Sequence, residues 1–356
     1  MKKILSLALA ALLVCPLLTA CGDSAGKYPN GEVNVLNWGE YISDGQDETL
    51  DVIKKFQEET GIQVNYTVCP DNETLYANLK QGDSYDVIIP SDYMISRLID
   101  EEMLLPLNFD NIPNAADVDP NFLNPAYDPE NTYSVPYMWG TVGIIYNTSM
   151  VDEAITSYQA LFDTKYAGQV LMINNSRDAI GVALKTLGYS YNITDPAQIA
   201  EATDLLIQQK KDGIVQAYVM DEIFDKLEGG EAAMGVYYAG DYLSMHANNE
   251  DLAFVLPSEG TNIFTDAMCI PVGAANQENA EKFINFMCST EVGVANCEAI
   301  GYSTPLMSVK AALDPEITSD PVAYPSDEVL ASCEAFLNLP EATLKLYDSE
   351  WLRLKA

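Results

Sequence analysis

The chain has 356 residues, and 48% of them are hydrophobic, so disorder over most of its length is excluded. The length suffices for one large domain or two ordinary ones. With 53 acidic against 18 basic residues the formal net charge is −35, which argues against nucleic-acid binding because that needs a basic face. Such acidity mainly indicates a well-solvated surface, and it favours a cationic ligand only weakly.

The first residues follow the order of a secretory signal peptide. Lys2 and Lys3 precede an apolar run that is too short to span a bilayer, and small residues follow the run. We therefore predict a signal peptide over 1–20 and a tether over 21–31. The run Leu18-Thr19-Ala20-Cys21 resembles the bacterial lipobox, in which the cysteine is acylated. An ordinary signal peptide with a chance cysteine is the alternative. Lipidation of Cys21 predicts anchoring to the outer face of the cytoplasmic membrane.

The segments beyond the tether alternate between short apolar runs and helical periodicity. Strands are expected at 33–36, 62–66, 86–90, 143–146 and 170–173. A helix is expected over 48–60, ended by Gly61, and another around Ala280, Phe283, Ile284 and Met287. This alternation favours α/β layers with mostly parallel sheets, in which ligands bind at the carboxyl ends of strands.

Cysteine spacing gives no sign of a metal site. Cys15 leaves with the signal peptide, and the five cysteines that remain beyond Cys21 are irregularly spaced and lack C-x-x-C. One or two disulfides are compatible with this count, although buried free thiols are favoured. The five are Cys69, Cys269, Cys288, Cys297 and Cys333.

The sequence offers little for an enzyme. His246 is the single histidine, and it is expected to be structural. No nucleophile elbow, P-loop or G-x-G-x-x-G is present, although abundant carboxylates leave glycoside hydrolysis open by composition. We therefore expect a binding protein without a catalytic residue, a cofactor or a metal.

Several short segments place an aromatic residue beside an acid or a hydroxyl group. Such pairs suit a polyamine, whose ammonium groups need carboxylates and whose methylene stem needs flat faces. Each pair alone is also expected by chance, because the chain has 3 Trp, 21 Tyr and 10 Phe. The segments are Asn37-Trp38-Gly39-Glu40-Tyr41, Ser91-Asp92-Tyr93, Tyr237-Tyr238-Ala239-Gly240-Asp241 and Phe264-Thr265-Asp266.

A family resemblance adds to these observations. From Val33 to the C-terminus the chain resembles, collinearly, the periplasmic spermidine/putrescine-binding proteins of polyamine ABC importers. Besides 37–41, the segments that carry the resemblance are Asn72-Glu73-Thr74-Leu75-Tyr76-Ala77, Tyr85-Asp86-Val87-Ile88-Ile89-Pro90-Ser91, Ser134-Val135-Pro136-Tyr137-Met138-Trp139-Gly140, Leu187-Gly188-Tyr189-Ser190, Ala239-Gly240-Asp241 and Ile300-Gly301-Tyr302-Ser303-Thr304-Pro305.

The resemblance implies the type II periplasmic-binding-protein fold, in which two α/β lobes enclose the ligand in a cleft. By the resemblance one lobe comprises 32–142 plus 265–312, and the other comprises 146–260 plus 318–356. The chain would cross between them near 141–146, 259–264 and 313–317.

The resemblance also implies the ligand contacts. Asp266 matches the carboxylate that the family places against an ammonium, and Asp241 matches one used by the putrescine-preferring branch. Tyr237 or Tyr238, and also Phe264, stand where tryptophan is usual. The full implied set is Trp38, Glu40, Tyr41, Ser91, Tyr93, Asn175, Asp178, Tyr237, Tyr238, Asp241, Phe264, Asp266 and Tyr302.

Two departures from the family pattern concern one end of that site. Asn175 is neutral where the spermidine branch has a carboxylate, and Asp178 stands at the position of a glutamate. A glutamine that the family carries near its C-terminus is replaced around Leu337. Fewer acids at one end predict a shorter ligand, putrescine, or a shifted spermidine.

The expected protein is thus a monomeric polyamine-binding lipoprotein that delivers its ligand to an ABC permease. Another cationic ligand, an amino acid or an anion on the same fold remains open, and the acids of the predicted cleft disfavour an anion. A polyamine-sensing lipoprotein without a transport role also remains open, because the sequence does not separate sensing from transport.

Overall fold

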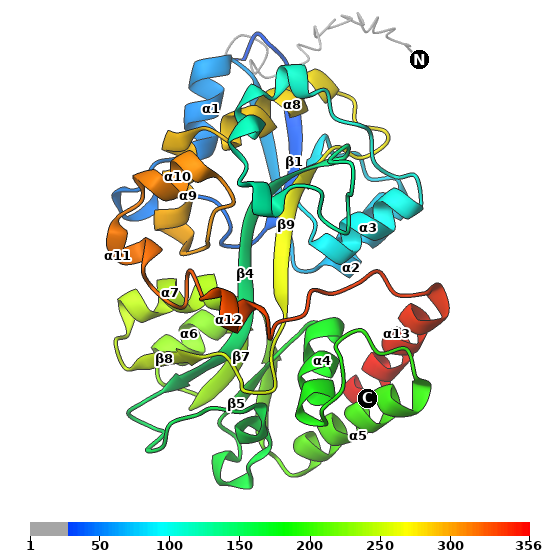
Figure 1. Cartoon of the computed structure of the whole chain (residues 1–356), viewed down its shortest axis with the longest axis vertical. Helices are drawn as coiled ribbons and strands as arrows, with labels where there is room; N and C mark the ends of the chain where they lie inside the picture. The colour runs from blue at the N-terminus through cyan, green and yellow to red at the C-terminus, as the bar shows by residue number, and fades with distance from the viewer. Residues whose placement is uncertain (1–27) are drawn as a thin grey trace, which may run out of the picture.

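A computed structural model describes residues 28–356 (Figure 1). The predicted signal peptide and Cys21 lie outside the described residues. Within 28–356 no helix is long and apolar enough to cross a membrane. The same residues contain no cluster of three or more His, Cys, Asp or Glu side chains arranged to hold a metal ion.

The strands form one continuous path in the order β2-β1-β3-β9-β4-β7-β5-β6, with β8 paired to β4. Their bounds are β1 Glu32–Trp38, β2 Gln63–Cys69, β3 Val87–Ile88, β4 Ser134–Asn147, β5 Val170–Ile173, β6 Val215–Val219, β7 Met234–Tyr238, β8 Leu252–Val255 and β9 Ile263–Cys269.

Helices cover both ends of this path. They are α1 Val52–Thr60, α2 Asn72–Gln81, α3 Asp92–Asp100, α4 Ser176–Thr186, α5 Pro196–Lys211, α6 Glu222–Glu228, α7 Ala239–Asn248, α8 Gln277–Met287, α9 Thr290–Ile300, α10 Met307–Ala312, α11 Pro315–Thr318, α12 Asp327–Leu330 and α13 Glu341–Lys355. Short 3-10 turns occur at Gln46–Glu48, Phe109–Asn111, Pro113–Asp117, Pro120–Phe122, Tyr158–Phe162 and Thr164–Tyr166.

The long strand β4 joins two halves of the molecule. Its first part, Ser134–Thr141, pairs with β9, and its last part, Val142–Asn147, pairs with β7 and β8. Figure 1 shows an upper half with α1–α3 and α8–α10 and a lower half with α4–α7 and α13, connected through β4 and β9. The finer division into lobes and hinges stays a prediction.

The fold is α/β, as predicted, but the pairing within the sheet is mixed. Parallel pairs form β2-β1-β3 in the upper half and β7-β5-β6 in the lower half. The pairs of β9 and β4 with their neighbours are antiparallel. The order of elements along the chain did not reveal this, because β9 pairs with strands more than 100 residues before it.

Local capping residues explain where α1 begins and ends. The helix predicted over 48–60 begins instead at Val52, because the Asp51 carboxylate caps it by accepting a hydrogen bond of 2.8 Å from the Lys54 amide. It ends at Gly61, whose φ of +67° suits glycine. The four apolar residues predicted to share a helix face are all buried in α8.

The five cysteines beyond Cys21 are free thiols, and four of them are buried. His246, the histidine that the sequence analysis expects to be structural, contacts a backbone carbonyl and an aromatic ring. Its Nδ1 lies 2.9 Å from the carbonyl oxygen of Leu252, and its ring packs against Tyr242 at 5.4 Å between centroids.

Candidate functional site

A cavity lies between the two halves and encloses about 760 Å³ of empty space, its mouth included. Both halves and the segment before α13 contribute to it. Its lining residues are Trp38, Gly39, Tyr41, Cys69, Pro70, Asp71, Asn72, Ser91, Asp92, Tyr93, Asn175, Asp178, Met220, Asp221, Tyr237, Tyr238, Asp241, Asn262, Phe264, Asp266, Tyr302 and Phe336.

The structure brings together twelve of the thirteen residues that the sequence implied. These are Trp38, Tyr41, Ser91, Tyr93, Asn175, Asp178, Tyr237, Tyr238, Asp241, Phe264, Asp266 and Tyr302. Glu40 is the exception: it is exposed, and its neighbour Gly39 lines the cavity instead. Partial burial, followed by repulsion from Asp221, raises the pKa of Glu40, so this carboxylate lies near the cavity without lining it.

Chain geometry explains why these residues meet. Trp38 ends β1, Asp92 begins α3 after β3, and Asn175 caps α4 directly after β5. Asp221 precedes α6 after β6, and Asp241 lies in the first turn of α7 after β7. The ends of these strands therefore converge on one region, as is usual for ligand sites in α/β sheets.

Asp266, on β9, is one of the carboxylates that line the cavity. Its Oδ2 accepts a hydrogen bond of 2.7 Å from the Tyr41 hydroxyl, while Oδ1 is buried without a hydrogen-bond partner. Burial raises the pKa of Asp266 to about 6. A buried carboxylate oxygen without a partner is costly, so a cation placed there would gain a charge-assisted hydrogen bond.

Two more carboxylates lie on the α6–α7 side of the cavity. Asp241 Oδ2 accepts from the Tyr302 hydroxyl at 3.0 Å, and Asp221 Oδ1 accepts from the Tyr237 hydroxyl at 3.2 Å. Burial raises the pKa of Asp241 well above its usual value, and repulsion from Asp221 adds to the rise. The lining of the cavity offers these two carboxylates hydroxyl donors but no basic side chain.

Asp178 and Asp92 are the carboxylates nearest to α4 and α3. Burial, with repulsion from Glu73, raises the pKa of Asp178 to about 7. Burial also raises the pKa of Asp92 to about 8, and repulsion from Asp266 contributes. In both cases the positive charge of Arg177 opposes the rise.

The charge of the lining is one-sided. Its residues include six aspartates and no lysine, arginine or histidine. Arg177 lies behind the wall, 2% exposed, with its guanidinium carbon 5.1 Å from the ring centroid of Tyr93. Because carboxylates that repel each other need a counter-charge, this cavity is suited to a ligand with more than one positive group.

Aromatic rings form the remaining walls. Tyr41 and Tyr302 meet edge to face at 4.7 Å between centroids, and Tyr238 meets Phe264 at 5.4 Å. Tyr237 and Tyr238 both line the cavity. Whichever of the two matches the usual tryptophan of the family, an aromatic ring therefore lies at that position. Such rings offer flat faces to methylene groups and negative π surfaces to cations.

Sequence reasoning missed several lining residues. Asp92 stands between two predicted residues, so its position gave a signal. Asp221 follows β6, a strand that the sequence did not predict, so it gave none. Phe336 gave none, because its segment is irregular and far along the chain. Leu337, where the missing family glutamine was sought, is 52% exposed, and its neighbour Phe336 lines the cavity.

Comparison with known proteins places the chain in a family. The model for bacterial extracellular solute-binding proteins matches residues 51–325. The chain belongs to this family of binding proteins. It is 34% identical over 368 residues to spermidine/putrescine-binding periplasmic protein 1 of Haemophilus influenzae, covering 100% of this chain and 99% of the relative. It is 33% identical over 348 residues to the spermidine/putrescine-binding periplasmic protein of Escherichia coli, covering 97% of each.

A solved structure agrees with these relatives. It is the spermidine/putrescine ABC transporter substrate-binding protein of Streptococcus pneumoniae, 36% identical, with a TM-score of 0.75 over 91% of this chain and 98% of that one. The fold predicted from the sequence resemblance, that of a periplasmic binding protein, is therefore confirmed.

Proposed function

We propose that this protein binds a polyamine outside the cytoplasm and delivers it to an ABC import permease. The observation that carries the proposal is the cavity lining, which joins six aspartates to aromatic walls and includes no basic side chain. The polyamine-binding relatives support the same ligand class. Binding itself is the function, and no catalytic step belongs to it.

In the proposed complex the ammonium groups of the ligand pair with the buried carboxylates. The free Oδ1 of Asp266 receives one ammonium, and Asp241 with Asp221 receives another. The rings of Tyr238, Phe264 and the other aromatic residues enclose the methylene stem. Each pair gains strength from the exclusion of water, since charges attract more strongly in a low dielectric.

We expect putrescine to be preferred over spermidine. The amide of Asn175 caps α4, with its oxygen accepting from the amide of Arg177 at 2.9 Å. The Asn175 amide adds no charge at the start of α4, and Asp178 is the carboxylate that this helix contributes to the cavity lining. The lower negative charge beside α4 favours a ligand with fewer ammonium groups.

The proposal includes two-lobed closure and a membrane anchor. The lobes predicted from the sequence would close about their crossovers on the ligand. Cys21, if acylated, would hold the monomer on the membrane that carries the permease and so raise its local concentration.

Calorimetric titration tests the ligand class. The soluble form beginning at Gly22 would be unfolded and refolded to remove bound ligand, and then titrated with putrescine, spermidine, spermine and glutamate. Binding of one or more polyamines without binding of glutamate is expected. A natively refolded protein that binds glutamate, or that binds no polyamine, would show that the ligand class is wrong.

A further inference from the structure

The two halves of the molecule touch across the cavity. The hydroxyl of Tyr302, which follows α9 of the upper half, donates to Asp241 of α7 in the lower half at 3.0 Å. Gly39, after β1, approaches Asp221 so closely that an added Cβ would lie 2.3 Å from Oδ2 of the aspartate. The halves are therefore closed on the cavity, and contacts between them outside it bear on how a ligand is retained.

Helix α13 is fixed to the lower half and faces α2 and α3 of the upper half (Figure 1). It packs against α5 and α4. Arg353 of α13 pairs with Asp204 of α5 at 2.6 Å, and Lys210 of α5 donates to the carbonyl oxygen of Leu354 at 3.0 Å. Because these contacts tie α13 to α5, we expect the helix to move with the lower half.

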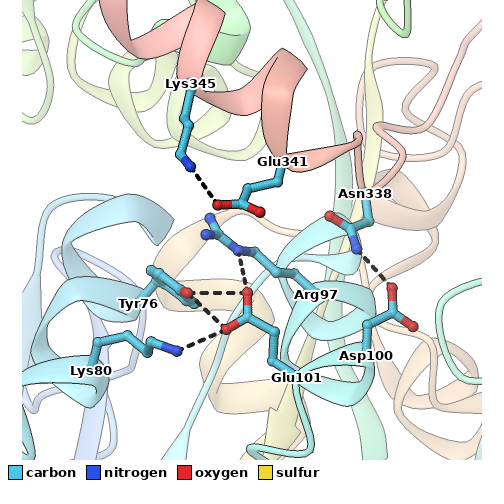
Figure 2. Close-up of polar contacts among 8 residues, drawn as sticks. All are labelled: Tyr76, Lys80, Arg97, Asp100, Glu101, Asn338, Glu341 and Lys345. Atoms are coloured by element: carbon cyan, nitrogen blue, oxygen red, sulfur yellow. Dashed lines mark hydrogen bonds and ion pairs between the residues drawn. The ribbon is translucent and has the colours of Figure 1, made fainter.

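One face of α13 carries charged residues toward α3. Glu341, Lys345 and Asp348 are spaced by four and then three residues, which places them on the same side of the helix. Glu341 pairs with Lys345 at 2.5 Å, and Figure 2 shows the guanidinium of Arg97 on α3 pointing toward this pair. The hydrogen bond from Lys345 lowers the pKa of Glu341, and the charge of Arg97 adds to this effect. Burial raises the pKa of Asp348, and Arg97 opposes that rise.

Arg97 is held in place by its own half of the molecule. Its guanidinium carbon lies 3.6 Å from the ring centroid of Tyr76 on α2, and its Nε donates to Glu101 at 3.1 Å. Glu101 also accepts from the Tyr76 hydroxyl at 2.8 Å and from Lys80 at 3.0 Å. With its Nε and one face of the guanidinium engaged within the upper half, Arg97 presents its other nitrogens to α13 (Figure 2).

A direct hydrogen bond joins the halves beside these charges. Nδ2 of Asn338, in the segment before α13, donates to Oδ2 of Asp100 at the end of α3 at 2.8 Å (Figure 2). An amide that faces a carboxylate forms a charge-assisted hydrogen bond, whereas two carboxylates would repel each other. The eight residues drawn in Figure 2 are called the rim cluster below. None of the eight is among the lining residues of the cavity.

We propose that the rim cluster is a latch, which holds the halves closed over a bound ligand and slows its release without touching it. The inference rests on the proposed polyamine function and on closure about the predicted crossovers. Opening would part α13 from α3, and so break the Asn338–Asp100 hydrogen bond and separate Arg97 from Glu341. Because these contacts form only after the ligand has entered, they act on the release rate more than on the association rate.

The test exchanges the two partners of the hydrogen bond. Asn338→Asp places two carboxylates together, Asp100→Asn leaves two amides, and the double variant restores an amide facing a carboxylate at the net charge of the wild type. Ala335→Asp is the matched control, because it adds the same charge to the same segment at an exposed position outside the rim cluster.

Stopped-flow tryptophan fluorescence, to which Trp38 of the cavity lining contributes, follows the association and release of putrescine. Calorimetry gives the Kd of each variant, and thermal unfolding confirms that each is folded.

Putrescine should leave Asn338→Asp about fivefold faster or more, because a hydrogen bond to a charged group is replaced by repulsion. The association rate should change by less than about twofold. The double variant should return to within about twofold of the wild-type release rate. Ala335→Asp should release putrescine no faster than the wild type, because an added negative charge by itself attracts a cationic ligand. Faster release from Asn338→Asp is thus opposite in sign to a simple charge effect.

Three results would overturn the latch: a folded Asn338→Asp with the wild-type release rate, a double variant as fast as Asn338→Asp, or equally fast release from Ala335→Asp. In each of these the wild type still binds putrescine, so the proposed function stands. A wild type that binds no polyamine would refute the proposed function itself, and the latch with it.

Discussion

Replacing Asp266 by asparagine should have opposite effects on ligand affinity and on the stability of the empty protein. The substitution keeps the shape of the side chain and the acceptor for the Tyr41 hydroxyl, but removes the charge. Truncating one partner of a buried charge pair costs about 2–5 kcal/mol of binding free energy. Putrescine should therefore bind about 30-fold to several thousand-fold more weakly.

The effect on stability follows from the pKa of the empty site. Burial raises the pKa of Asp266 from 3.8 to about 6, so the folded state binds a proton more tightly than the unfolded chain. The stability that this proton supplies is present below pH 3.8 and is lost as the pH rises through about 6. The rise corresponds to up to about 3 kcal/mol. The Asp266→Asn variant would escape this loss, because its amide carries no charge at either pH, so the empty variant should be the more stable protein above pH 6.

Calorimetry with putrescine and urea unfolding of the ligand-free protein at about pH 4 and about pH 8 measure the two effects. Asp152→Asn is the control, since Asp152 is exposed and its loss changes the net charge equally. If Asp266→Asn bound putrescine as tightly as the wild type, or were less stable than Asp152→Asn at the higher pH, the assignment of Asp266 would be wrong.

Three further predictions concern the same cavity. Below the pKa of about 7 for Asp178, putrescine affinity should fall about tenfold per pH unit, and protonation of Asp92, whose pKa is about 8, should add to the fall. Calorimetric titrations in buffers of different ionisation enthalpy should detect the protons released on binding. A flat affinity profile between about pH 6 and 8 would contradict this. Gly39→Ala should weaken the binding of every polyamine by about tenfold with little change in unfolding temperature, because the added Cβ would lie 2.3 Å from Oδ2 of Asp221 and displace that carboxylate. Unchanged affinity would show that the two residues can move apart without affecting the site. Asn338→Ala removes one hydrogen bond to Asp100 of α3 and should cost about 1 kcal/mol or less of binding free energy, equally for putrescine and spermidine. A change in the ratio of the two dissociation constants would be inconsistent with a purely supporting role of Asn338.

Local pattern accounts for much of the fold. The buried strand β5 was predicted with its observed bounds, because four consecutive apolar residues between turns have few alternatives. The start of α1 was misplaced by four residues, since acidic residues before Asp51 continue a helical composition and the cap itself decides where the helix begins. The antiparallel pairing of β4 with β9 left no local signal, because it joins segments more than 100 residues apart.

The sequence by itself determined the class of the protein and most of the candidate site, because collinear motifs mark the same strand ends that converge in space. Only the tertiary structure showed that Asp221 and Phe336 line the cavity and that Arg177 lies behind its wall. It also decided the pKa shifts of the buried carboxylates. A pKa depends on burial and on neighbouring charges, and both arise only when α3, α4, β9 and the segment before α13 pack together.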